Sequence, residues 1–554
     1  METLNKVLFA SAFVLILFYL FDILSLKDKR ITIKQSPKTD ISFGKKETYI
    51  IIALTFIGAL ARVYKFGSLP FAINQDEAMA AVDAKSLADY ATDRFGTFLP
   101  AHLFGWGYGQ MSALLSYFMV PFIKIFGLNT TAVRLPSLLI SFAGMAAVYL
   151  FARELINKHF ALIALFFTSI CPWHFIQSRW SIDCNLFPHL FLLGLMCLAL
   201  GLKNKKFIYI SMGFFALCMY SYGLSFFMVP FFLIAASLIL LQGKLIKPVD
   251  ILICAVIYLL ISFPIYGTMI INAFKWDTVK LPFVTMPYFK DSVRMNDLIF
   301  YSTEPFKQFY ANLKTLIGVA FIQKEDLIWN SIGAFGTIYK FTTPFVLLGI
   351  FVIIYKCKYE EDAKRKILYR IFTAYCASAF VLGTLVNGVN VNRINIIFYS
   401  HILLAAIGVI SIFKWAGKVK PVVIVCYAVL SAVFFSTYLN DYQNMIGSSF
   451  YGDFINALEY AKTCDADRYY ITPDTQYQGS ANVSEILTLY AMDVDSKFFQ
   501  SSDYNNKFHF VNPDTDLTVT TAGKNVYVIR SSETGNYDLE GRSVKAFGDY
   551  TVFT

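Results

Sequence analysis

The sequence has 554 residues, of which 56% are hydrophobic, 17% aromatic and only 16% charged, and its net charge is +10. A soluble protein of this length needs more polar surface than this composition supplies, so lipid is expected to be the main solvent of the chain. The positive charge does not indicate a nucleic-acid partner, because most Lys and Arg residues stand in short segments between apolar stretches, as in membrane proteins.

Twelve apolar stretches follow one another along the chain. Most have about the length that a helix needs to cross a hydrocarbon core of roughly 30 Å. The first has no basic leader and no small-residue cleavage site, so it is predicted to be a retained span rather than a signal peptide. The predicted spans are residues 7–26, 48–65, 133–152, 160–173, 185–202, 207–220, 222–241, 250–271, 338–356, 368–386, 394–413 and 420–439.

Four short basic segments orient these spans. They are expected to face the cytoplasm, which places both termini outside. The segments are Lys27–Lys46, Lys203–Lys206, Lys356–Lys366 and Lys414–Lys420. A further apolar stretch, Met111–Phe126, does not fit as a crossing, because counting it would move the later basic segments to the outer face. It contains Lys124 and Pro121 and is predicted to lie along the outer surface.

The first outside loop, residues 66–132, is therefore predicted to hold two in-plane helices, near 76–92 and 110–126. The second outside loop, 272–337, is long, aromatic and mixed in charge, and a loop of this length is usually functional. It could act as a lid or as an acceptor platform.

The composition becomes polar after Leu439, with short β-like runs at Arg468–Thr472 and Asn525–Arg530. The predicted fold is an all-α polytopic membrane protein with about twelve transmembrane helices and in-plane juxtamembrane helices, plus a small C-terminal extracytoplasmic α/β domain. Its predicted parts are an N-terminal transmembrane helix and basic cytoplasmic loop (1–47), a transmembrane catalytic domain (48–440) and the outer domain (441–554).

Polar residues at the outer ends of spans are the candidates for chemistry, because ionisable groups at a membrane edge are often functional. They are Asp76, Glu77, Arg134, Arg179, Asp183, Asn392 and Arg393. Asp76 and Glu77 begin a predicted amphipathic helix. One interpretation is that the two acids cap the helix and are favoured there by the helix dipole. The other is that one of them is the general base for an acceptor hydroxyl.

The arginines also have two interpretations each. Arg134 either anchors a helix end at the membrane surface or pairs with a carboxylate or phosphate. Arg179 either forms an ion pair with Asp183, four residues on, or turns toward a bound anion. Asn392 and Arg393 stand among further asparagines and form either a polar helix cap or a phosphate site.

No cofactor is predicted, although the sequence leaves the use of a divalent metal open. Walker, Rossmann, Ser-His-Asp and HExxH signatures are absent from the sequence, and the nine cysteines have no disulfide or zinc spacing. His102, His174 and His189 have no ligand spacing and are interpreted as structural.

A set of segments in a fixed order carries a family resemblance over roughly residues 48 to 440. It comprises the acid pair, an in-plane helix ending in Phe126-Gly127, Arg134-Leu135-Pro136-Ser137, Ala152-Arg153-Glu154-Leu155, and the loop from Ser178-Arg179 to Asp183-Cys184-Asn185. In this order they resemble the polyprenyl-phosphate-dependent membrane glycosyltransferases of the GT-C superfamily. Within this superfamily the sequence most resembles the branch that contains the protein O-mannosyltransferases and the lipid A aminoarabinose transferases, and it is similar to glycosyltransferase family 39. The presence of a C-terminal outer domain resembles the domain arrangement of bacterial members of the superfamily.

The resemblance implies an inverting glycosyltransferase of the plasma (cytoplasmic) membrane with its active site on the extracytoplasmic face. The expected partners are membrane lipid, a polyprenyl-phosphate-linked sugar donor and an acceptor that is a cell-wall polymer or other glycan, a glycolipid or a protein. Asp76 would accept the proton of the acceptor hydroxyl, with Glu77 as its orienting neighbour. Arg393 and Arg179 would stabilise the leaving phosphate, and Arg134 either joins them or holds Glu77.

Two other functions share these features. A transporter or flippase for lipid-linked saccharides would also need outer arginines, but it predicts polar residues in mid-span and repeat symmetry, and the sequence shows neither. A polysaccharide polymerase or ligase that uses lipid-pyrophosphate glycans differs only in its donor, which the sequence does not identify.

Overall fold

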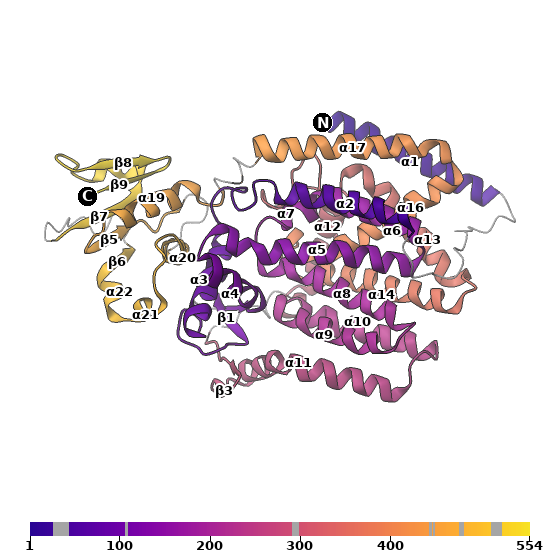
Figure 1. Ribbon diagram of the computed structural model, residues 1–554, viewed down its shortest axis with the longest axis horizontal. Helices are drawn as coiled ribbons and strands as arrows, with labels where there is room; N and C mark the ends of the chain where they lie inside the picture. The colour runs from indigo at the N-terminus through magenta and orange to yellow at the C-terminus, as the bar shows by residue number, and fades with distance from the viewer. Residues whose placement is uncertain are drawn as a thin grey trace.

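The computed structural model describes residues 1–25, 44–105, 109–290, 298–442, 446, 449–475, 481–510 and 523–554. Most of the predicted basic segment Lys27–Lys46 lies outside these residues. The described chain forms a bundle of long helices that run side by side, with a small mixed domain at one end (Figure 1).

Each of the twelve predicted spans coincides with a helix, which confirms the predicted fold class. These helices are α1 (Glu2–Ser25), α2 (Lys45–Val63), α5 (Thr130–Leu155), α6 (Lys158–Ile170), α8 (Leu186–Gly201), α9 (Lys206–Ser221), α10 (Ser225–Gln242), α11 (Pro248–Phe274), α13 (Thr343–Tyr359), α14 (Ala363–Leu385), α16 (Ile397–Trp415) and α17 (Lys420–Thr437).

Nine helical stretches of the described chain are long and apolar enough to cross a membrane, and α2, α6 and α9 are not among them. α2 carries two lysines and a glutamate in its first turn and Arg62 in its last. α6 has 13 residues, but it is followed directly by α7 (Pro172–Gln177). Together α6 and α7 provide about 30 Å of helix, the length of a span.

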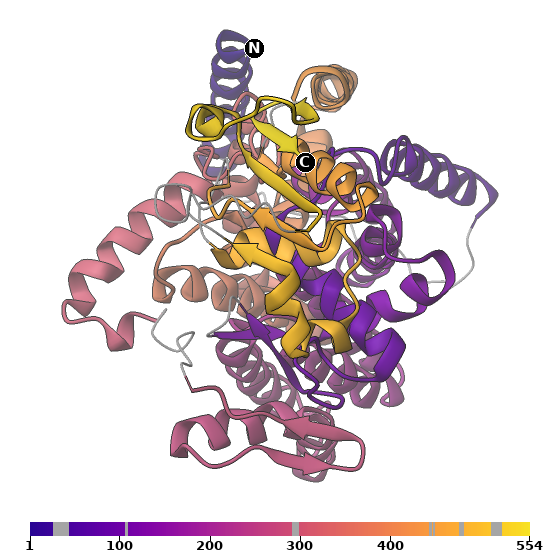
Figure 2. The same cartoon turned by 90° about the vertical axis from the view of Figure 1, so that its left-hand side faces the viewer.

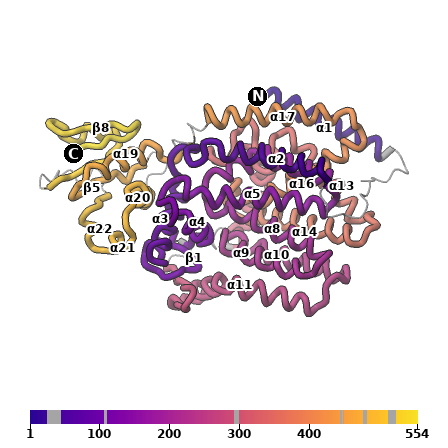
Figure 3. Tube along the Cα trace, in the orientation of Figure 1, coloured from indigo at the N-terminus to yellow at the C-terminus, as the bar shows by residue number. Residues whose placement is uncertain are grey.

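The described basic segments meet at one end of the bundle, here called the basic end. Lys203, in the turn between α8 and α9, forms an ion pair of 2.6 Å with Glu154 at the end of α5. Lys364 at the start of α14 donates to the carbonyl oxygen of Leu202 in the same turn, at 3.4 Å. The opposite end, called the loop end, carries the first long loop and the C-terminal domain (Figure 3).

The first long loop contains the two predicted in-plane helices, α3 (Gln75–Tyr90) and α4 (Leu114–Phe126). α4 begins at Leu114 rather than near 110, because β2 (Gly109–Ser112) pairs antiparallel with β1 (His102–Gly105). α3 is not an amphipathic surface helix as predicted. Nearly all of its residues are buried, since it packs between α4 and α20 (Ala481–Ala491) of the C-terminal domain.

The second long loop has a structure that the sequence did not predict. It contains the hairpin β3 (Val279–Leu281) and β4 (Val284–Met286), the short helix η3 (Ile299–Tyr301), and α12 (Pro305–Ala320). Asn312 of α12 donates to the carbonyl oxygen of Thr384 at the end of α14, at 3.1 Å. Figure 2 shows α12 at the periphery of the bundle, where Phe306 is 90% exposed.

The C-terminal domain is an α/β unit, as predicted. Its sheet has the order β6-β5-β7-β9-β8, with β5 parallel to β6 and β7, and β9 antiparallel to β7 and β8. The predicted strands 468–472 and 525–530 are its central strands. The elements are α19 (Gly452–Thr463), β5 (Arg468–Ile471), α21 (Ser496–Phe499), α22 (Ser502–Lys507), β6 (Phe508–Phe510), β7 (Asn525–Arg530), η7 (Ser531–Asn536), β8 (Val544–Phe547) and β9 (Tyr550–Phe553), in addition to α20.

Candidate active site

A cavity of about 210 Å³ at the loop end brings four of the seven predicted site residues together. Asp76 comes from the first turn of α3, Asp183 from the loop before α8, and Asn392 and Arg393 from the segment before α16. The rest of the wall consists of Met79, Met111, Ile182, Cys184, Tyr222 and Asn390. Three segments far apart in the sequence therefore share one small polar space.

The first turn of α3 places Asp76 toward this cavity. The N-cap residue Asn74 accepts a hydrogen bond from the backbone N–H of Asp76 at 3.0 Å, which fixes where the helix begins. Asp76 is half-buried, whereas Glu77 is completely buried. A carboxylate in the first turn is stabilised as an anion by the helix dipole, so this position suits a group that must stay ionised.

Glu77 and Arg134 form an ion pair with no exposed surface. The Arg134 Nε donates to Glu77 Oε1 at 2.8 Å and its Nη2 to Glu77 Oε2 at 3.0 Å. Arg134 also donates to the carbonyl oxygens of Pro70, at 2.8 Å, and Ala72, at 2.6 Å. The backbone N–H of Ser181 donates to the same Glu77 carboxylate at 2.8 Å. The pair does not line the cavity and instead joins α3, α5 and the loop before α8.

Arg179 is also buried and outside the cavity wall. Its guanidinium donates to the backbone carbonyl oxygen of Arg62 in the last turn of α2, at 2.8 Å, and to those of Lys65 and Leu69 just after α2, at 3.1 Å each. The ring of Phe175 lies 5.3 Å from the same guanidinium. Arg179 thus supports the chain that leads into α3.

The segment with Asn392 and Arg393 is short and closely supported. Asn390 caps α15 (Val391–Ile394) by accepting from the backbone N–H of Arg393 at 3.0 Å. The Arg393 guanidinium donates to the carbonyl oxygen of Asn387. Asp326, in the loop before α13, accepts from the backbone N–H of Val391. Burial raises the pKa of the Asp326 carboxyl, while this hydrogen bond opposes the shift.

Side-chain amides hold the Asp183 segment against α15. Asp183 begins η1 (Asp183–Asn185) and accepts from the backbone N–H of Cys184 at 2.7 Å. Asn185 donates to the carbonyl oxygens of Gln177 and Trp180, at 3.2 Å each. Asn395, just after α15, donates to the carbonyl oxygen of Cys184 at 2.6 Å. The two walls that carry Asp183 and Arg393 are therefore fixed to each other.

Three residues of this arrangement are not among the predicted site residues. Tyr222, at the end of α9, lines the cavity without belonging to any motif. Asp326 supports α15 from the second long loop, for which no single site residue is predicted. Arg62 is buried near the end of α2 and donates to the carbonyl oxygen of Ser169 at 3.0 Å and to His174 Nδ1 at 2.8 Å. An arginine near the end of a predicted span, 48–65, was the available signal.

The histidines His174 and His189 belong to a hydrogen-bonded network. The Tyr399 hydroxyl lies 3.0 Å from His174 Nε2 and 2.7 Å from His189 Nδ1. His102 lies apart, with its ring 5.8 Å from the ring of Phe226. Within the part of the chain that the structure describes, no group of three His, Cys, Asp or Glu residues is placed to hold a metal ion.

Comparison with protein families gives a match over residues 112–267 to the family described as dolichyl-phosphate-mannose-protein mannosyltransferase. This stretch runs from β2 into α11 and includes Arg134, Arg179 and Asp183, but neither Asp76 nor Arg393. A sequence comparison with curated proteins finds no match.

Two solved structures share the fold. ArnT from Cupriavidus metallidurans, bound to undecaprenyl phosphate, has a TM-score of 0.54 at 11% identity, and the alignment covers 92% of this chain and 97% of ArnT. An Archaeoglobus fulgidus oligosaccharyltransferase in complex with zinc and sulfate has a TM-score of 0.50 at 14% identity, covering 84% of this chain. The chain spans only 62% of that protein. Residues 112–267 are thus similar to this mannosyltransferase family, and the chain shares its fold with ArnT and with the oligosaccharyltransferase.

Proposed function

We propose that the chain is an inverting glycosyltransferase that moves a sugar from a polyprenyl-phosphate-linked donor to an acceptor hydroxyl. The observation that carries the proposal is that Asp76 and Arg393 line one cavity at an end of the membrane bundle. A transfer from a lipid phosphate needs a base for the acceptor and a cation for the leaving group, and this cavity offers both. The undecaprenyl phosphate bound to ArnT supports this donor class.

In this mechanism the acceptor oxygen attacks the anomeric carbon from the side opposite the phosphate. Asp76 takes the proton of the acceptor hydroxyl as the new carbon–oxygen bond forms. The bond between the anomeric carbon and the phosphate oxygen breaks, and its electron pair leaves with the lipid phosphate, so the configuration at the carbon is inverted. Arg393 offsets the charge on that phosphate, and the Asn392 amide adds a hydrogen-bond donor.

The other candidate residues then act by position or by recognition. Glu77 and Arg134 hold the first turn of α3 in place, and Arg179 holds the chain before it. Asp183 faces the sugar or the acceptor, since a carboxylate accepts hydrogen bonds from hydroxyl groups. We further propose that the loop end faces the extracytoplasmic side of the plasma membrane. The acceptor is a cell-wall polymer, a glycolipid or a protein.

The test uses the purified full chain in detergent with a radiolabelled polyprenyl-phosphate hexose and candidate acceptors of the three classes. Removing a general base typically lowers the rate by about 10²- to 10⁴-fold, so Asp76→Asn is expected to reduce transfer by that factor. The rate should be measured at saturating donor. The base assignment is wrong if Asp76→Asn transfers sugar at the wild-type rate.

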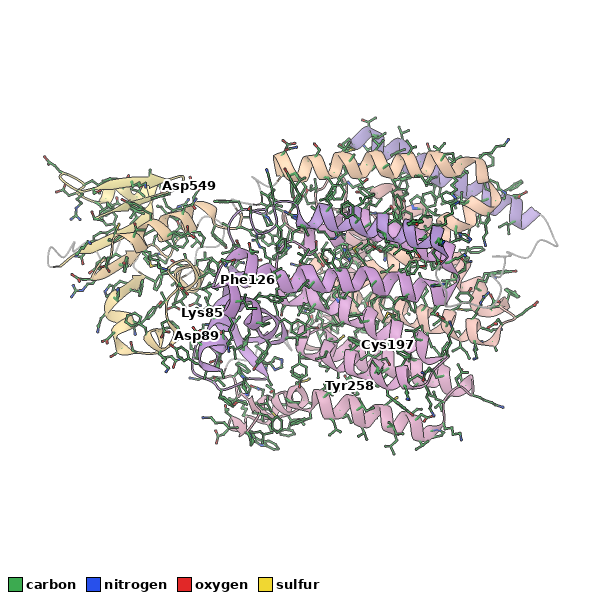
Figure 4. The ribbon with its side chains drawn as sticks, viewed as in Figure 1. Lys85, Asp89, Phe126, Cys197, Tyr258 and Asp549 are labelled. Atoms are coloured by element: carbon green, nitrogen blue, oxygen red, sulfur yellow. The ribbon has the colours of Figure 1, made fainter. Side chains whose placement is uncertain are left out.

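Asp89→Asn is the matched control. Asp89 lies on the same helix, where it pairs with Lys85 (Figure 4), and it does not line the cavity. The same chemical change there should leave the transfer rate unchanged. If wild type consumes no lipid-linked sugar with any acceptor but moves such a lipid across vesicle membranes, the chain is a transporter and the proposed function fails.

A further inference from the structure

A second cavity, of about 560 Å³, lies at the basic end of the bundle between α2, α6, α16 and α17. Three of these helices have their opposite ends at the candidate active site. α2 leads into the loop before α3, α6 leads through α7 to Arg179, and α16 begins just after α15. The two cavities therefore lie at opposite ends of the membrane-spanning bundle.

The walls of this second cavity are apolar and its mouth is basic. The walls include Ile50 and Leu54 of α2, Leu162 and Phe166 of α6, Val409 of α16 and Ile424 of α17. Three lysines from three different helices, Lys46, Lys158 and Lys420, stand at the first turn of their helices and line the mouth. Such a division suits a molecule with an apolar chain and an anionic head.

The depth of the cavity matches one leaflet of a bilayer. Along α6, the distance from Lys158 to Phe167 corresponds to about 14 Å of helix, and along α2 the distance from Lys46 to Leu54 to about 12 Å. Half of a hydrocarbon core of roughly 30 Å is about 15 Å. The walls thus accommodate an acyl chain over about the depth of one leaflet.

The charge at the mouth is positive. The acid in the lining, Glu47, is buried and accepts from the Tyr149 hydroxyl, and the Arg153 guanidinium lies 3.9 Å from its carboxylate. Its charge is thereby offset inside the protein. The three lysines are exposed, and no ion pair of theirs is found with another residue in the described part of the chain.

We propose that this cavity binds one anionic glycerophospholipid, with an acyl chain between the apolar walls and the phosphate among Lys46, Lys158 and Lys420. The bound lipid links α17 to α2 and α6 at the basic end. A polyprenyl phosphate is also an anionic lipid, but its chain is far longer than one leaflet is deep. The cavity fits the shorter chain of a phospholipid.

Native mass spectrometry of the full chain in mild detergent tests the proposal. The probes are phosphatidylglycerol and phosphatidylcholine with identical acyl chains, and a polyprenyl phosphate. Each lysine near a phosphate contributes roughly fivefold in binding. Wild type is therefore expected to prefer phosphatidylglycerol over phosphatidylcholine by about a hundredfold, and the triple variant Lys46/Lys158/Lys420→Gln should lose this preference.

The matched control is Lys45/Lys206/Lys418→Gln. It removes the same charge from exposed lysines of the basic end that do not line the cavity, so it should keep the preference. Leu162→Trp fills the cavity and should prevent the binding of either phospholipid. If the triple variant does not fold, Lys158→Gln alone should weaken phosphatidylglycerol binding by about fivefold.

Three outcomes would overturn the proposal. The first is an equal loss of phosphatidylglycerol binding in the two triple variants, which would indicate a general effect of surface charge. The second is undiminished binding to Leu162→Trp, which would place the lipid elsewhere. The third is displacement of phosphatidylglycerol from wild type by an equimolar polyprenyl phosphate, which would make the cavity a site for that lipid. None of these outcomes depends on glycosyl transfer.

Discussion

At the scale of single residues, the acid pair at the start of α3 divides into two roles. Successive residues of a helix point about 100° apart, so the cavity and the interior of the bundle each receive one carboxylate. Asp76 lines the cavity, and Glu77 faces Arg134 with no exposed surface. The residue that caps the helix is Asn74, whose side chain accepts a hydrogen bond from the Asp76 N–H.

We predict that Arg134→Leu destabilises the chain by about 3–5 kcal/mol, because it leaves the buried Glu77 carboxylate without its partner. The double variant Glu77→Leu/Arg134→Leu should be more stable than Arg134→Leu, since no charge is then buried alone. Thermal unfolding in detergent measures both. Equal melting temperatures of Arg134→Leu and wild type would contradict the assignment of Arg134 to this pair.

At the scale of elements, short segments at the loop end depend on side chains from other elements. α15 has four residues and therefore little stability as a helix of its own. Asn390 caps it from within, and Asp326 holds the backbone N–H of Val391 from the loop before α13. Asn395 ties the next turn to Cys184. These contacts fix Asn392 and Arg393 relative to Asp183.

We predict that Asp326→Ala weakens binding of the lipid-linked donor, because the buried Val391 N–H loses its acceptor at a cost of about 1–3 kcal/mol. The donor KM should rise about 5- to 150-fold, with a smaller change in kcat at saturating donor. Asp326→Asn keeps an acceptor oxygen in the same place and should restore a KM near that of wild type. If both variants behave alike, Asp326 does not position α15 through this hydrogen bond.

At the scale of the whole molecule, the C-terminal domain covers the helix that carries Asp76. The Tyr90 hydroxyl at the end of α3 donates to Asp495 at 2.6 Å, and Gln500 donates to the carbonyl oxygen of Arg94 at 3.0 Å. The rings of Phe95 and Phe499 lie 5.7 Å apart. Together with α20, which packs on α3, these contacts explain why most of α3 is buried.

We predict that the double variant Phe499→Ala/Gln500→Ala loosens the domain from α3. The lost ring contact and hydrogen bond together amount to about 1–3 kcal/mol. Amide hydrogen exchange of residues 75–90 should therefore become faster by about 5- to 150-fold if these amides open when the domain detaches. Mass spectrometry of deuterium uptake measures this change.

The control is Val544→Ala on β8. The Val544 side chain is 47% exposed, and it has no contact with α3 among the residues that the structure describes. Exchange of α3 should not change in this variant. Unaltered exchange in the double variant as well would mean that α3 is stable without the domain.

Local features of the sequence suffice to predict the membrane-spanning architecture of this protein. A span is recognised by about 20 apolar residues in a row, which is a local property, so each predicted span from residues 7–26 to 420–439 has its helix. The polar composition and the β-like runs of the C-terminal region are local properties as well. Predictions failed where an element depends on pairing or packing with another one, as for β2, which pairs with β1, and for α3, which packs between α4 and α20.

Which of the candidate residues face one another depends on contacts between segments that are far apart in the chain. Arg134, Arg179 and Arg393 have the same place in the sequence pattern, at or near the ends of spans. Arg134 is neutralised by Glu77 and Arg179 is satisfied by carbonyl oxygens, whereas Arg393 lines the cavity with Asp76. The partners of a buried guanidinium come from segments far away in the chain, and a sequence pattern contains no record of those distances.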